Sequence, residues 1–127
     1  MMKILLTLFV LLFSSSVFAE WTKVGTTVAG DGLYVDIRTI KIVGGTRYFL
    51  DMTDYVVPSP YGDLSSSSYT EINCSNMMYK DLLKNYYSLP LAEGDTTEGS
   101  GQIKNPKWES FETGSAGSLL IKFVCDF

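Results

Sequence analysis

The stretch GDGLYVDIRTIKIVGGTRYFLDMTDYVV, residues 30–57, indicates how this chain folds. Apolar Leu33, Val35 and Ile37 alternate with more polar residues, which is the period of a β-strand with one apolar face. Glycines before this run and at Gly44-Gly45 supply the positive φ angles of tight turns. The stretch therefore predicts short strands over 33–37 and 39–43 and a long strand over 46–57.

Turn signals continue on both sides of this stretch. Pro58 and Pro60 end the long strand, because proline cannot donate to a sheet ladder. Residues 81–84 could also be helical, but the tyrosines around them favour a strand. The polar, glycine-rich segment 91–104 is long for a connection, and we expect it to be mobile. Further strands are predicted over 21–28, 65–73 and 77–89, which together give an antiparallel sheet.

The alternation in the long strand is imperfect. Phe49 and Tyr55 fall on the face opposite Leu50 and Met52. Apolar residues on both faces of one strand indicate a sheet that is partly covered on both sides.

The C-terminal segment fits two structures. Residues 119–127 alternate as a strand would, with apolar side chains at every second position. Leu120, Ile121, Val124 and Cys125 also form the stripe of an amphipathic helix. Periodicity alone leaves both structures open.

The first nineteen residues have the layout of a secretory signal. One positive charge, Lys3, precedes an apolar run over 4–13, and small residues follow up to Ala19. The apolar run is about half the length that a membrane-spanning helix needs. We expect residues 1–19 to be a signal peptide that is cleaved between Ala19 and Glu20, leaving one domain over 20–127.

Cys74 and Cys125 are the only cysteines of the chain. In an exported protein an isolated pair is most simply a disulfide. The alternative is two free thiols in a redox or metal site, against which the absence of C-x-x-C spacing argues.

The composition lacks what most catalytic sites use. The chain has no histidine, which removes Ser-His-Asp and Cys-His catalysis and histidine metal ligands. Asp51 and Asp54 point to opposite faces of a strand, so we expect solvated charges rather than an acid–base pair. The net charge of −4, without a Lys/Arg run, argues against nucleic-acid binding. We therefore expect a protein that is not an enzyme and binds no cofactor, metal or nucleic acid.

Tyrosines are frequent in and beside the predicted strands. Tyrosine combines an apolar ring with a polar hydroxyl, and it is enriched at protein interfaces. The sequence thus offers a candidate partner-binding surface made of Tyr48, Tyr55, Tyr69, Tyr86 and Tyr87.

The order of several short motifs resembles the surface-adhesin protein E family of small exported bacterial proteins. These motifs include Glu20–Gly25, Gly30–Asp36, Tyr69–Cys74, Pro106–Trp108 and Lys122–Cys125. The resemblance implies an α+β fold with a single antiparallel sheet of about five to six strands and one C-terminal helix packed on it. The helix would run from about Ser115 to Cys125, with a Cys74–Cys125 disulfide tying it to the sheet.

The resemblance also implies a function. Members of the family bind host extracellular-matrix and serum proteins, so we expect a non-enzymatic exported module with a protein partner. The family's lipid-anchored adhesin needs a cysteine where this chain has Glu20; we therefore expect no membrane anchor after cleavage and a periplasmic or secreted protein. The alternative is a soluble periplasmic accessory or inhibitor protein with no adhesive role. Open sheet edges also allow a homodimer.

Overall fold

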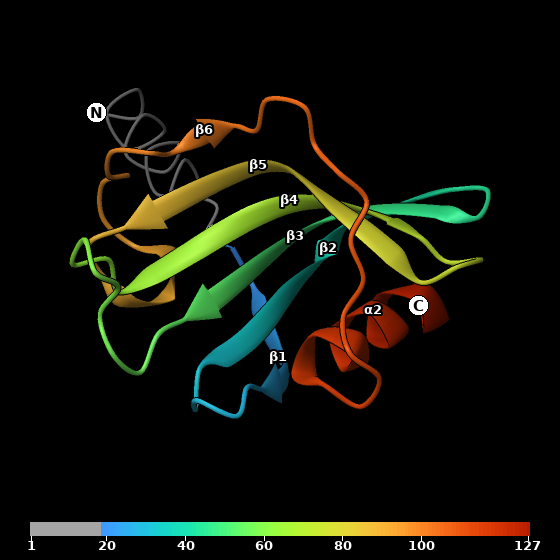
Figure 1. Cartoon of the computed structure of the whole chain (residues 1–127), viewed down its shortest axis with the longest axis horizontal. Helices are drawn as coiled ribbons and strands as arrows, with labels where there is room; N and C mark the ends of the chain where they lie inside the picture. Colours follow the sequence, from blue (N-terminus) through green and yellow to red (C-terminus); the bar gives the residue numbers. More distant parts are fainter. Residues whose placement is uncertain (1–18) are drawn as a thin grey trace, which may run out of the picture.

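The computed structural model describes residues 19–127. Of the predicted signal peptide over residues 1–19, residues 1–18 lie outside the described residues. Within 19–127, one antiparallel sheet has its six strands in the order β1-β2-β3-β4-β5-β6 (Figure 1). The elements are β1 (Trp21–Thr26), β2 (Gly32–Val43), β3 (Thr46–Asp54), β4 (Ser65–Asn73), β5 (Met78–Tyr87), the 3₁₀ turn η1 (Pro90–Ala92), β6 (Gly101–Gln102) and α2 (Ala116–Asp126). The predicted sheet and C-terminal helix are confirmed.

The prediction of separate strands over 33–37 and 39–43 is wrong, because both belong to β2. The pairing of β2 with β3 is interrupted between Asp36 and Lys41. There the Thr39 hydroxyl donates to the Asp36 carbonyl at 2.7 Å and accepts from the Leu50 amide at 2.8 Å. A side chain thus replaces backbone pairing, and the strand continues through the irregularity.

The segment 91–104, which the sequence predicts to be a long and mobile connection, contains regular structure. It begins within η1 and contains β6, which pairs with Leu83 and Lys84 of β5. The Thr97 amide donates to the Tyr86 carbonyl at 2.8 Å, and the Ile103 amide donates to the Leu82 carbonyl at 3.0 Å. These hydrogen bonds hold the segment along the edge of β5.

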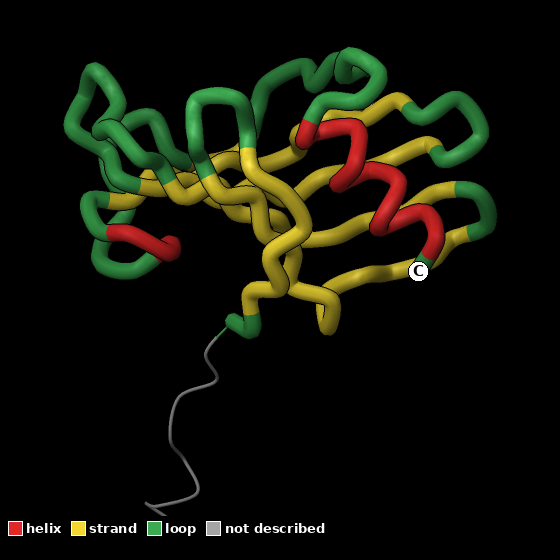
Figure 2. Tube along the Cα trace, turned by 90° about the horizontal axis from the view of Figure 1, so that it is seen from below, coloured by secondary structure: helices red, strands yellow, loops and turns green. Residues whose placement is uncertain are grey.

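One face of the sheet carries the main core. Leu33, Val35, Phe49 and Ile72 are buried there with Leu120, Ile121 and Val124 of α2. The helix contacts β1 and β2, and Figure 2 shows it lying across one face of the strands. The side chain of Ser115 caps the helix by accepting from the Ser118 amide, which satisfies one donor of the first turn.

The opposite face is covered by η1, as the imperfect alternation of β3 predicts. Met52 is fully buried but does not belong to the main core. The Ser65 hydroxyl donates to the Leu89 carbonyl at 2.6 Å and accepts from the Ala92 amide at 2.9 Å. Small serine side chains on the central strand therefore let the η1 segment approach the sheet closely.

A disulfide joins Cys74, just after β4, to Cys125 in α2, with the Cα atoms 5.8 Å apart. The chain folds into a helix over 116–126, so the alternative of a final strand is wrong. A helix satisfies its own backbone hydrogen bonds, whereas a strand here would need an edge partner.

Candidate functional site

The tyrosines predicted to form one partner-binding surface are all half-buried and lie in different places. Tyr48 and Tyr69 stack with their ring centroids 6.3 Å apart. The nearby Glu71 carboxylate raises the pKa of Tyr48, because a negative charge disfavours the phenolate. The Tyr87 hydroxyl lies 3.0 Å from the Ser67 hydroxyl.

The neighbouring Tyr86 points to the opposite face from Tyr87, since successive strand residues alternate. Its ring lines a hollow with Tyr61 and Asp63. Tyr55 follows β3, and its amide donates to the Leu64 carbonyl at 3.0 Å. The structure therefore divides these five side chains, Tyr48, Tyr55, Tyr69, Tyr86 and Tyr87, between the two faces and one end of the sheet.

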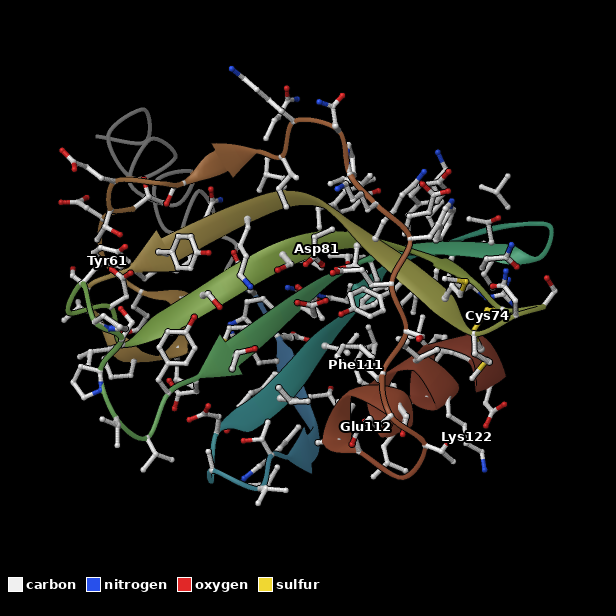
Figure 3. The ribbon with its side chains drawn as sticks, viewed as in Figure 1. Tyr61, Cys74, Asp81, Phe111, Glu112 and Lys122 are labelled. Carbon is white, nitrogen blue, oxygen red and sulfur yellow. A yellow bond between two sulfur atoms is a disulfide. The ribbon has the colours of Figure 1, made fainter. Side chains whose placement is uncertain are left out.

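A groove of about 570 Å³ lies on the helix face of the sheet, bounded by α2 and by the segment that precedes it, and its lining is mostly apolar. Its floor carries Asp51, Thr70, Asp81 and Lys84. Figure 3 shows Asp81 over the middle of the sheet, with Phe111 between it and α2. The Thr70 oxygen lies 2.8 Å from Oδ2 of Asp51 and 3.2 Å from Oδ1 of Asp81.

Burial raises the pKa of Asp51 to about 7. The hydrogen bond from Thr70 and the charge of Lys84 lower this pKa, while the Asp81 carboxylate raises it. A hydroxyl has one hydrogen, so Thr70 can bond both carboxyl groups at once only if one of them is protonated. The prediction that Asp51 is a solvated charge is therefore wrong, because Asp51 shares the Phe49 face.

Asp54 lies on the other face, as predicted, where its Oδ1 accepts from the Leu91 amide at 2.9 Å. This bond is one of three that join the loops at one end of the sheet. The Val56 amide donates to Asp31 Oδ1 at 2.9 Å, and the Thr97 hydroxyl donates to Asp63 Oδ1 at 2.8 Å. Residues 27–31, 54–64 and 88–100 therefore form one surface, which we call the loop end (left and lower left in Figure 1).

Large apolar side chains project from the loop end. Val57 is 73% exposed and Tyr61 92% exposed. Val28 and Val56 are also exposed, and a Cβ added at Gly30 would meet the Val56 side chain, so the turn of residues 27–31 lies next to Val56. A hollow of about 760 Å³ lies next to this group, lined by Ser59, Pro60, Tyr61, Asp63, Tyr86, Thr97, Glu98 and Gly99.

The loop end is also acidic. No lysine, arginine or histidine occurs in its three segments. Its carboxylates belong to Asp31, Asp54, Asp63, Glu93, Asp95 and Glu98. Sequence reasoning missed this surface, although the absence of a basic residue from 48 to 79 and from 85 to 103 was a signal that could have found it.

Residues 19–127 contain no group of three or more histidine, cysteine, aspartate or glutamate side chains that could hold a metal ion. The same described part of the chain has no helix of the length and apolar character that a membrane crossing requires.

Comparisons with known proteins agree with this architecture. A search of curated proteins finds no match. Crystal form II of Haemophilus influenzae protein E is similar, with a TM-score of 0.63 and 16% identity over 87% of this chain and 91% of that one. Protein E from non-typeable Haemophilus influenzae has a TM-score of 0.59 and 16% identity over 88% of this chain and 79% of that one. At this identity the likeness shows the fold.

The family model described as surface-adhesin protein E matches residues 21–126, which include every strand and the C-terminal helix. The chain therefore belongs to the surface-adhesin protein E family.

Proposed function

We propose that this chain is an exported, non-enzymatic module that binds a protein partner through its loop end. The description of its family as a surface adhesin supports this role. The observation that carries the proposal is the group of exposed apolar side chains on the loop end: Val28, Val56, Val57 and Tyr61.

Exposed apolar side chains that gather on one surface mark sites of protein contact. Single exposed side chains would need no such explanation, but these come from two loops that the Asp31–Val56 hydrogen bond joins. Because these loops are already hydrogen-bonded to one another, binding costs less ordering entropy than it would for free loops.

The proposed location is outside the cytoplasm, in the periplasm or the medium. A disulfide between Cys74 and Cys125 supports it, because such bonds persist in oxidising compartments. Glu20, at the predicted cleavage site, is not the cysteine that a lipid anchor at that position would need. Cell fractionation tests the location: material that stays in the cytoplasm with intact residues 1–19 would contradict it.

Surface plasmon resonance against a panel of purified extracellular-matrix and serum proteins tests the binding. We expect saturable binding to at least one of them, weakened about tenfold or more by Val56→Ser with Val57→Ser, since each buried valine contributes about 1.5 kcal/mol or more. The matched control is Ile42→Ser with Val43→Ser, which removes side chains 54% and 51% exposed at the opposite end of the sheet. Equal losses in both variants, or no saturable binding, would contradict the proposal.

A further inference from the structure

The basic residues of the molecule all lie outside the loop end. The carboxylates of the loop end have no basic residue within the same three segments. Lys41 of β2, Arg47 of β3 and Lys80 of β5 lie toward the far end of the sheet. Lys122 lies on α2 (Figure 3). A weak net charge of −4 therefore conceals a strongly acidic surface.

The ion pairs of residues 19–127 do not neutralise this surface. Arg38 pairs with Glu20 and Asp36, and Lys80 pairs with Glu71, all outside the loop end. Asp31 and Asp54 accept hydrogen bonds from the uncharged amides of Val56 and Leu91, which leave their negative charges uncompensated. Glu93, Asp95 and Glu98 are exposed to solvent.

From this we propose that the loop end binds a cationic protein segment in which lysine or arginine alternates with apolar residues. The inference rests on the proposed function and names the partner's chemistry. The partner's basic groups would meet Glu93, Asp95 and Glu98, while its apolar side chains would cover Val56, Val57 and Tyr61. Complementary charge speeds the encounter of two proteins and disfavours partners of like charge. The acidic loop end therefore excludes an acidic segment or a polyanion.

The geometry favours such a segment over a second copy of the chain. Glu93, Asp95 and Glu98 come from one connection, and Thr96 forms an isolated bridge with Tyr87 of β5. The apolar side chains come from the neighbouring β3–β4 loop, whose Tyr61 lines one hollow together with Glu98. A short, extended basic segment can contact both groups, whereas the basic residues of the opposite end are spread over several strands and the helix.

The test uses the full chain, isolated after export, and a fluorescein-labelled peptide of alternating Lys and Val or Tyr residues. Fluorescence anisotropy should show saturable binding that weakens steeply from about 0.1 M to about 1 M salt, which shortens the Debye length from about 10 Å to about 3 Å. Peptides with Glu in place of Lys, or Ser in place of Val and Tyr, should bind at least about tenfold more weakly.

Two charge-matched triple variants locate the site. The first is Glu93→Gln, Asp95→Asn and Glu98→Gln; the second is Glu109→Gln, Glu112→Gln and Asp126→Asn, which removes the same charge from exposed residues elsewhere. We expect the first to weaken peptide binding about tenfold and the second less than about twofold. Equal losses would mean non-specific attraction to net charge and would overturn the inference.

Other outcomes separate this inference from the proposed function. If matrix- or serum-protein binding depends on Val56 and Val57 but ignores the first triple variant, the inference fails and the proposed function stands. If sedimentation shows self-association that the first triple variant abolishes, the occupant is a second copy and the inference is overturned. If neither the peptide nor any panel protein binds, both fail.

Discussion

Phe111 stacks on Tyr79 of β5, with ring centroids 4.3 Å apart and ring planes 9° apart. The backbone of Glu109 pairs with that of Tyr79 just beside the stack. Burial, together with the nearby carboxylates of Glu109, Asp81 and Asp51, raises the pKa of Tyr79 to about 12. The pair thus holds the segment before α2 against the sheet and closes one side of the groove beside α2.

Phe111 can occupy its position only because residue 117 is a glycine. A Cβ at that position would collide with the Phe111 ring. Gly117→Ala should lower the free energy of unfolding by about 1–2 kcal/mol, since the ring must move off Tyr79 or the helix must shift. Urea denaturation measures the change. Gly45→Ala is the control, because nothing lies within 4 Å of a Cβ there; equal losses in the two variants would contradict the packing argument.

Asp51 makes stability depend on pH. Its pKa is raised from 3.8 to about 7 in the folded protein, so the folded state binds the proton more tightly than the unfolded state does. The stabilisation that this bound proton gives the folded state is fully present below about pH 4 and is lost as the pH rises through about 7. Asp51→Asn should therefore stabilise the protein at pH 8, by on the order of 2 kcal/mol, and change little at pH 4.

Thermal unfolding of Asp51→Asn across this pH range gives the measurement. Asp126→Asn, which alters an exposed carboxylate at the end of α2, serves as the control and should not change the pH profile. A profile of Asp51→Asn that runs parallel to that of the parent protein would show that Asp51 titrates normally.

Reduction of the Cys74–Cys125 disulfide should lower the free energy of unfolding. The bond joins residues separated by 51 positions, and the chain-entropy model gives about 4 kcal/mol for a loop of that size. Denaturant unfolding with and without a reductant measures the loss. The Cys74→Ser, Cys125→Ser variant should unfold like the reduced protein and be insensitive to reductant; thiols that can be alkylated without reduction would contradict the bond.

The cap of α2 gives a smaller, local prediction. Ser115 accepts from the Ser118 amide at 3.2 Å, and loss of such a cap costs about 1 kcal/mol. Ser115→Ala should therefore lower the midpoint of urea unfolding, whereas Ser110→Ala, in the exposed segment before the helix, should leave it unchanged. Equal midpoints for Ser115→Ala and the parent chain would show that the cap contributes nothing.

The strands and turns follow from the sequence because local signals specify them. The alternation over 33–37 brings the start of β2 within one residue of its observed position, and Pro58 brings the end of β3 within three residues of its observed position. The continuation of β2 past Thr39 was not predictable, since it depends on a hydroxyl that bonds Leu50 on another strand. Periodicity alone does not decide whether the C-terminal segment is a strand or a helix, and the family resemblance was needed to identify the helix.

The candidate sites were predicted less well than the fold. Tyrosine content indicated a surface, but strand alternation places Tyr86 and Tyr87 on opposite faces. The burial of Asp51 depends on neighbours from β4 and β5, Thr70 and Asp81, which no local pattern reveals. The loop end brings together three segments that are far apart in the sequence, so only the topology shows that their charges add.

Every strand of the sheet pairs with its neighbour in sequence, yet Leu120, Ile121 and Val124 of the main core lie in the last helix. A nascent chain that emerges from its N-terminus can assemble the meander step by step, but the apolar face stays uncovered until the final residues arrive. A chain that ends before α2 would leave Phe49 and Ile72 open to water. The truncated product would become a substrate for chaperones and proteases.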